Sequence, residues 1–170
     1  LDMPESVLVR LNGKFRPGIT LRDAVNYIPI AAMDLELQSP FGEGTDNIFN
    51  SRILEIEGLT RELTVEQAFE LSCAAAERSA AACTVDLATD QVSAYLRSNL
   101  ALMQRMVQAG YQAAPALQKR IAAVEAWLKQ PQLVRRDENA DFAAVLELDV
   151  SNIKEPALAF PNNPDNAGWL

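Results

Sequence analysis

Two short polar segments of the chain carry side chains that can bind a substrate or handle a proton. The first is Asn50-Ser51-Arg52, at the entry to a run rich in branched residues. Amides and hydroxyls both donate and accept hydrogen bonds, and a guanidinium forms a planar fork that suits carboxylates. Asn50 and Ser51 are therefore candidate substrate-binding residues. The alternative is that all three residues serve only the geometry of an exposed turn.

The second segment, Ala76-Glu77-Arg78-Ser79, lies between the end of an expected helix and the next expected strand. Alanines surround it, and such small neighbours let the backbone approach closely and can leave Glu77 partly buried. A desolvated carboxylate can act as a general acid or base, so Glu77 is a candidate catalytic residue. The alternative is a solvated Glu-Arg pair, which is common at helix ends.

The residue types that are missing narrow the chemistry further. The chain has no histidine, which excludes Ser-His-Asp and Cys-His catalysis within it. Its two cysteines, Cys73 and Cys83, are fewer than the three or four thiolates that a structural zinc or an iron–sulfur site usually requires. We therefore expect no metal site within this chain, two packing cysteines and a reducing compartment.

The composition is that of a soluble globular protein, with 49% hydrophobic and 22% charged residues among 170. Fifteen Lys and Arg against 23 Asp and Glu give 15 − 23 = −8, which argues against binding of nucleic acid or anionic lipid. No apolar run approaches the ~18 residues of a membrane span, and the start does not resemble a signal peptide, so we expect a cytoplasmic protein. The chain opens on Leu1 rather than on Met, and we interpret the chain as a piece of a longer polypeptide.

The chemistry-bearing segments must be positioned by alternating strands and helices. Strand-like patterns cover 6–11, 52–57, 81–87 and 142–150, and helix-like patterns cover 20–28, 64–77, 89–109 and 115–129. We expect Pro29 to kink or interrupt the first helix. This order predicts an α/β fold, a three-layer domain with a central parallel or mixed sheet covered by helices.

In open α/β sheets, ligands bind beyond the carboxyl ends of the strands, and the two polar segments are the candidates for such a site. The expected domain covers residues 1–156. Residues 157–170 have the composition of a linker, without a packed element, leading toward a following domain. We expect Trp169 in this segment to need cover from another domain.

Six blocks of the chain carry a more specific signal. They read LDMPESVLVR, LNGKFRPGITLRDAV, NIFNSRILEIEGL, VEQAFELS, AERSAAACT and LDVSNIKEPALAFPNNPD. Together they resemble the aconitase B family of bacterial bifunctional aconitate hydratases and 2-methylisocitrate dehydratases. The resemblance spans essentially the whole chain but only part of the much longer family chain, where it corresponds to one of the internal α/β domains around the active site.

The resemblance implies that the parent protein is a hydro-lyase of the tricarboxylic acid cycle. Such enzymes interconvert citrate and isocitrate through cis-aconitate, and this family also acts between 2-methyl-cis-aconitate and 2-methylisocitrate. They use a [4Fe-4S] cluster, whose ligands the resemblance locates outside this chain. The partners implied are these substrates and the other domains of the same polypeptide, and the isolated piece is expected to be inactive.

The resemblance also implies roles for individual residues. Glu77 matches the glutamate of the family's Ala-Glu-x-x-Ala segment, which lines the active site and supports the hydroxyl or water at the open iron of the cluster. Close relatives read Phe-Ser-Gly-Arg where this chain reads Phe49-Asn50-Ser51-Arg52, so Asn50 stands at the position of the substrate-contacting serine and Ser51 at that of the glycine. Either of the two can provide the contact. A second hypothesis is a non-catalytic α/β interaction or regulatory module that keeps the fold without the chemistry.

Overall fold

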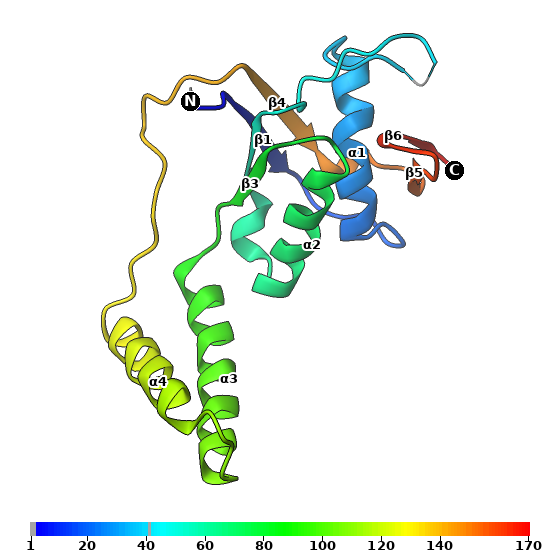
Figure 1. Ribbon diagram of the computed structural model, residues 1–170. Helices are drawn as coiled ribbons and strands as arrows, with labels where there is room; N and C mark the ends of the chain where they lie inside the picture. Colours follow the sequence, from blue (N-terminus) through cyan, green and yellow to red (C-terminus); the bar gives the residue numbers. More distant parts are fainter. Residues whose placement is uncertain (1–2, 41) are drawn as a thin grey trace.

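A computed structural model describes residues 3–40 and 42–170 of the chain. A four-stranded parallel sheet with the order β3-β2-β1-β4 forms its centre, and a two-stranded antiparallel sheet, β5-β6, follows at the C-terminal end (Figure 1). The elements are β1 (Ser6–Asn12), α1 (Leu21–Asp34), β2 (Ile53–Gly58), α2 (Val65–Ala76), β3 (Ala82–Val85), α3 (Thr89–Gln108), α4 (Ala114–Lys129), β4 (Ala144–Asp149), β5 (Ala157–Phe160) and β6 (Asn163–Trp169). Two short 3-10 helices, Leu59–Glu62 and Val150–Asn152, complete the order.

One face of the parallel sheet carries the main hydrophobic core. Successive side chains of a strand point to opposite faces, so alternate residues of β1, β2 and β4 reach the same side. Their partners there come from the apolar faces of α1 and α2. The buried members of this core include Val7, Val9, Leu11, Leu54, Ile56, Leu146 and Leu148 from the strands and Val25, Ile28, Leu71 and Ala75 from the helices.

The helix α1 continues through Pro29, where the sequence predicted a kink or a restart. It spans Leu21–Asp34 as one helix, and Pro29 is buried within it. A proline removes one backbone hydrogen bond, but α1 buries residues on both sides of it, including Ile28 and Ala32. Burial of this apolar face therefore outweighs the local penalty, since tertiary packing supplies most helical stability.

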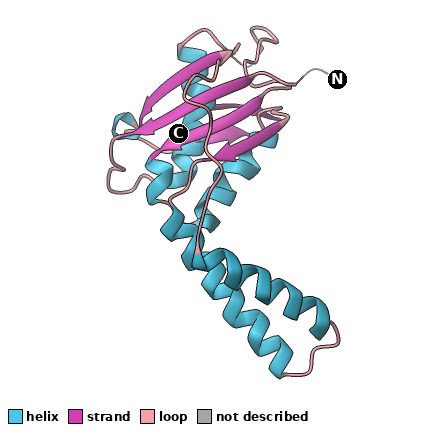
Figure 2. Ribbon diagram, turned by 90° about the vertical axis from the view of Figure 1, so that its left-hand side faces the viewer, coloured by secondary structure: helices cyan, strands magenta, loops and turns pink. Residues whose placement is uncertain are grey.

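On the opposite face of the sheet, an extended segment packs in place of helices. A segment of residues 131–143 runs across it from α4 to the start of β4, in front of the strands in Figure 2. Arg136 in this segment donates to Glu57 of β2, and the backbone N–H of Ala143 donates to the carbonyl of Ser6. The helices α3 and α4 pack against each other as a hairpin that projects away from the sheet (Figure 1).

The C-terminal residues differ from the predicted linker. Residues 157–169 pair as the antiparallel strands β5 and β6, which pack on α1 through Ile30, Ala157 and Ala167. The ring of Trp169 lies 5.6 Å from that of Tyr27, so α1 covers it in part and it stays 42% exposed. The sequence missed this hairpin because Pro, Asn and Gly dominate it, and its stability comes from docking rather than from strand propensity. The predicted boundary at residue 156 stays a prediction.

The predicted fold class is confirmed: the chain is an α/β protein with a parallel sheet on which helices pack. Each of the four predicted strands exists, although β3 is shorter than predicted. Among the described residues, no helix has both the length and the apolarity needed to cross a membrane.

Candidate functional site

Asn50, Ser51 and Glu77 lie at the amino edge of the sheet. Ser51 comes two residues before β2, Glu77 lies between the end of α2 and the start of β3, and the first residues of these parallel strands pair with each other. This corrects the expectation of a site beyond the carboxyl ends, because residues that precede parallel strands gather at the edge where those strands begin. All three side chains are exposed.

The fold brings the two predicted segments into direct contact. The backbone N–H of Ser51 donates to the carbonyl of Ser79 at 2.9 Å. Both residues adopt the left-handed conformation, with φ of 59° for Ser51 and 61° for Ser79. Two turns that are distant in the sequence are therefore joined, with Asn50 one residue before Ser51 and Glu77 two residues before Ser79.

The turn that carries Glu77 is set by how α2 ends. The N–H of Ala80 donates to the carbonyl of Ala75, and the N–H of Ser79 donates to that of Ala76. This pair of bonds is the Schellman pattern, in which the left-handed residue is usually glycine. Here it is Ser79. At the other end, Thr64 and Gln67 form the capping box that the sequence predicted.

The turn that carries Asn50 is organised by Asn47, which the sequence analysis did not single out. Its Oδ1 accepts from the N–H of Phe49 at 2.9 Å, and its Nδ2 donates to the carbonyl of Arg78 at 3.2 Å. Asn47 thus links both turns through one side chain. Phe49 anchors the same turn in the core at 1% exposure. An Asn followed two residues later by a buried aromatic was the available signal, because Asn side chains often bond the backbone two residues on.

Arg52 is held by the protein itself at the start of β2. Its Nε donates to the Glu5 carboxylate at 3.0 Å, and its Nη1 donates to the carbonyl of Ile48 at 3.0 Å. These two contacts orient the guanidinium along the amino edge of the sheet. The side chain is 31% exposed, so one side of it still faces solvent.

Arg78 does not lie at the surface, although Glu-Arg pairs at helix ends usually do. It is only 2% exposed and belongs to the largest fully buried side chains. Its Nη2 donates to Oδ1 of Asn26 at 3.2 Å and lies 3.4 Å from the carbonyl of Val25, both in α1. Glu77 and Arg78 therefore point in different directions, one toward solvent and the other between two helices.

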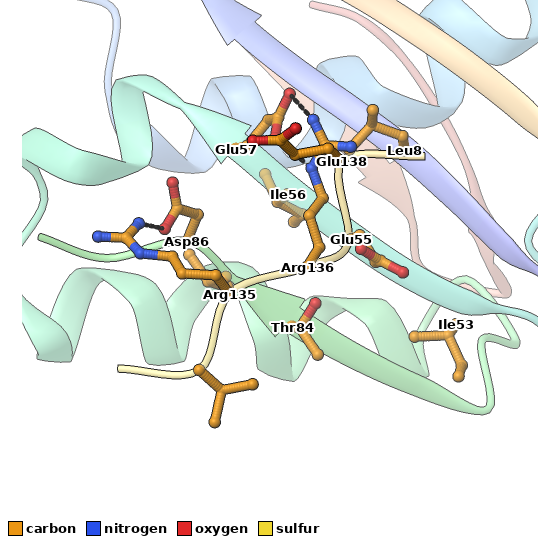
Figure 3. A pocket seen from close by; sticks show the side chains of 12 residues that line it. Leu8, Ile53, Glu55, Ile56, Glu57, Thr84, Asp86, Arg135, Arg136 and Glu138 are labelled. Atoms are coloured by element: carbon orange, nitrogen blue, oxygen red, sulfur yellow. Dashed lines mark hydrogen bonds and ion pairs between the residues drawn. The ribbon is translucent and has the colours of Figure 1, made fainter. Parts of the chain in front are cut away.

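A separate cavity of about 580 Å³ lies over the face of the sheet that the segment 131–143 crosses (Figure 3). Arg135 pairs with Asp86 and Arg136 with Glu57 across it. Burial alone would raise the pKa of Glu57, but the hydrogen bond from Arg10 and the charge of Arg136 lower it overall. None of the predicted site residues lines this cavity.

The two cysteines differ in environment. Cys73 is exposed, which corrects the prediction of a packing residue, because α2 turns that side away from the core. Cys83 packs against the core, and burial raises the pKa of its thiol to about 12. Within the described residues, no three His, Cys, Asp or Glu side chains come together as a metal site.

Comparisons with known proteins find relatives that are similar to the chain over its whole length, while no protein-family model matches it. It is 53% identical over 170 residues to aconitate hydratase B of Pseudomonas aeruginosa, and 52% identical over 170 residues to that of Salmonella typhimurium. It is also 52% identical over 167 residues to aconitate hydratase B of Escherichia coli. These alignments cover 98–100% of the chain but only 19–20% of the relatives, so the chain spans about a fifth of their length. The sequence and these relatives together show that the chain belongs to the aconitate hydratase B family.

Proposed function

We propose that this chain forms one wall of the active site of an aconitate hydratase, and that the pocket is completed by other parts of the same polypeptide. The reaction is the dehydration and rehydration that interconvert citrate and isocitrate through cis-aconitate, together with the corresponding hydration of 2-methyl-cis-aconitate. The observation that carries the proposal is the 2.9 Å hydrogen bond between Ser51 and Ser79. It joins the two segments that the sequence singled out for substrate binding and catalysis.

Glu77 is the proposed catalytic residue. Its carboxylate is exposed at the amino edge of the sheet, where it can meet a substrate held by the rest of the enzyme. Dehydration removes a hydroxyl and a proton from neighbouring carbon atoms, and rehydration adds them back. A carboxyl group beside the hydroxyl can pass a proton to it as it leaves as water, and can take a proton back from water during rehydration; the proton on carbon is left to another group of the enzyme.

Asn50 and Ser51 are the proposed substrate-binding residues, and the backbone favours Asn50 for the side-chain contact. Ser51 is in the left-handed conformation, which glycine adopts most easily. Glycine is the residue expected there from the resemblance, so Asn50 keeps the place of the substrate-contacting serine without a shift in register. The Asn50 amide can donate to a substrate carboxylate, and Oδ1 of the same amide lies 3.2 Å from the Ser51 hydroxyl.

The [4Fe-4S] cluster implied for such an enzyme does not fit the residues of this chain. The chain holds two cysteines and no histidine, and its thiols differ in environment, one exposed and one partly buried. A Cys-ligated cluster takes more thiolates than this. Its ligands would come from other parts of the polypeptide, and the roles proposed here are those of this chain's own side chains.

The test is the substitution Glu77→Gln in the full-length parent enzyme. We expect kcat to fall about 100-fold, the scale of general acid–base catalysis, while KM changes little. Glu66→Gln is the matched control, because Glu66 is an exposed glutamate in the first turn of the same helix. Wild-type kcat in Glu77→Gln would refute the catalytic role and favour the alternative of a non-catalytic interaction module.

A further inference from the structure

We infer that Arg78 is the positioning residue of the Glu77 turn, holding the proposed catalytic carboxylate in place from inside the protein. The inference rests on the proposed function of Glu77. It assigns Arg78 no contact with the substrate, because the side chain is buried away from the exposed face of the turn. The role follows from two sets of contacts, one at the guanidinium of Arg78 and one at its backbone.

The side-chain end is fixed in α1. Nη2 of Arg78 donates to Oδ1 of Asn26 at 3.2 Å, and Asn26 is itself only 4% exposed. The Asn26 amide is oriented in turn, because its Nδ2 donates to the carbonyl of Ala157 at 2.8 Å. The N–H of Ala157 donates to Oδ1 of Asp23 at 3.1 Å. The guanidinium therefore ends in a buried polar network that spans α1 and β5.

The backbone end is fixed by the neighbouring turn. The carbonyl of Arg78 accepts a hydrogen bond from Nδ2 of Asn47 at 3.2 Å. One residue further on, the carbonyl of Ser79 accepts from the N–H of Ser51. Glu77 precedes these two anchored peptides directly. Its Cα–Cβ direction depends on the backbone of this turn, so a displacement of Arg78 should turn the Glu77 side chain as well.

An arginine at position 78 is better explained by the positioning of Glu77 than by a contribution to stability alone. Burying a charged side chain carries a large solvation cost unless its hydrogen bonds are well satisfied, and an apolar residue of similar size often stabilises a fold better. Arginine stays charged and offers donors in a rigid planar fork, whereas lysine is a flexible point charge. A fork that bonds two neighbouring groups of α1 fixes direction as well as distance. A small error in the direction of a catalytic group costs rate.

The experiment compares Arg78→Lys, Glu77→Gln and the double variant in the full-length parent enzyme. We expect Arg78→Lys to lower kcat about ten- to hundredfold with little change in KM, the size of effect that a misplaced catalytic group produces. The double variant should be no slower than Glu77→Gln alone, because residues that act as a unit are not additive. Arg22→Lys is the matched control, since Arg22 lies on α1 and is 53% exposed in an ion pair with Glu70.

The outcomes separate this inference from the proposed function. A normal kcat for Arg78→Lys beside a slow Glu77→Gln overturns only the inference, as do multiplied losses in the double variant, which indicate a general structural defect. A normal kcat for Glu77→Gln overturns the proposed function and the inference with it.

If Arg78→Lys does not fold, Asn26→Ala takes its place in the comparison. This variant removes one acceptor of Arg78, Oδ1 of Asn26, and leaves the guanidinium present. It should lower kcat several-fold and again be non-additive with Glu77→Gln. A wild-type kcat for Asn26→Ala overturns the inference.

Discussion

Ser51 and Ser79 face each other in a backbone conformation that costs an L-residue roughly 1–2 kcal/mol. Ser51 is itself a proposed site residue and Ser79 lies two residues after Glu77, and strained backbone is often found at functional sites. The strain is held by the hydrogen bond between them and by the bonds of Asn47 to both turns. Local conformation at the site is therefore determined by its neighbours rather than by the residues' own preference.

The substitution Ser51→Gly tests this strain directly. Glycine adopts positive φ without penalty, so we expect the free energy of unfolding of the 170-residue chain to rise by up to about 1 kcal/mol. Ser72→Gly, within α2, is the control and should lower it by about 0.5–1 kcal/mol. Chemical denaturation measures both. A loss of stability in Ser51→Gly would contradict the strain.

The two cysteines should react differently with an alkylating reagent. Cys73 is exposed, whereas burial raises the pKa of Cys83 to about 12, so Cys83 stays a thiol at about pH 8. We expect mass spectrometry to find one modified cysteine, Cys73, in the native chain and two after denaturation. Modification of Cys83 at the same rate as Cys73 in the native chain would contradict this prediction, because it would show that Cys83 is accessible to the reagent.

At the scale of elements, three helices end in the same way with different residues. The ends of α1, α2 and α3 each place one residue at positive φ, namely Glu36, Ser79 and Gly110. Each end has the paired hydrogen bonds of the Schellman pattern. The sequence predicted the stop at Gly110, because glycine marks such ends. The other two were not visible, because packing of the following chain imposes the conformation there.

Asp23 joins two elements, since it caps α1 and also holds β5. One carboxylate oxygen accepts from the N–H and hydroxyl of Thr20, and the other accepts from the N–H of Ala157. Burial alone would raise the pKa of Asp23, but these hydrogen bonds lower it below its ordinary value of 3.8. The charged form is therefore the one that stabilises the fold.

Asp23→Asn should lower the free energy of unfolding by about 1–3 kcal/mol at about pH 7, because an amide cannot accept all of these bonds. A lowered pKa in the folded state gives stability that is present above the unfolded pKa and is lost as pH falls through the folded one. The difference from wild type should therefore shrink at about pH 3. Urea denaturation at both pH values measures it, with Asp34→Asn at the exposed end of α1 as the control. An equal difference at both values would contradict the assignment.

At the scale of the whole molecule, this chain closes its own hydrophobic core but leaves the proposed site open to solvent. The core is closed between the parallel sheet, α1 and α2, with strand residues such as Val9 and Leu146 at 0% exposure. The proposed site lies on an open edge, with Asn50, Ser51 and Glu77 exposed. A chain that spans a fifth of its relatives can therefore hold its own fold while it presents only one side of a pocket.

We expect the isolated 170-residue chain to fold but to leave citrate and isocitrate unchanged. Folding should appear as a cooperative unfolding transition, as is usual for small single domains. Activity should be absent because the proposed function assigns the groups that complete the pocket to other parts of the polypeptide. A coupled assay of citrate–isocitrate interconversion, with the full-length enzyme as the positive control, checks the second part. Turnover by the isolated chain after cluster reconstitution would contradict it.

Local patterns in the sequence were enough to predict the α/β class, the four strands of the main sheet and the capping box at Thr64, while the resemblance of six sequence blocks indicated the family. Alternation and helical periodicity record which face of each element is buried, and that information is local. The pairing of Ser51 with Ser79, the uninterrupted α1 and the C-terminal hairpin appeared only in the tertiary structure. So did the buried Arg78, whose acceptor Asn26 is 52 positions away. Each of these depends on contacts between distant segments, and their energies outweigh the local preferences of the residues involved.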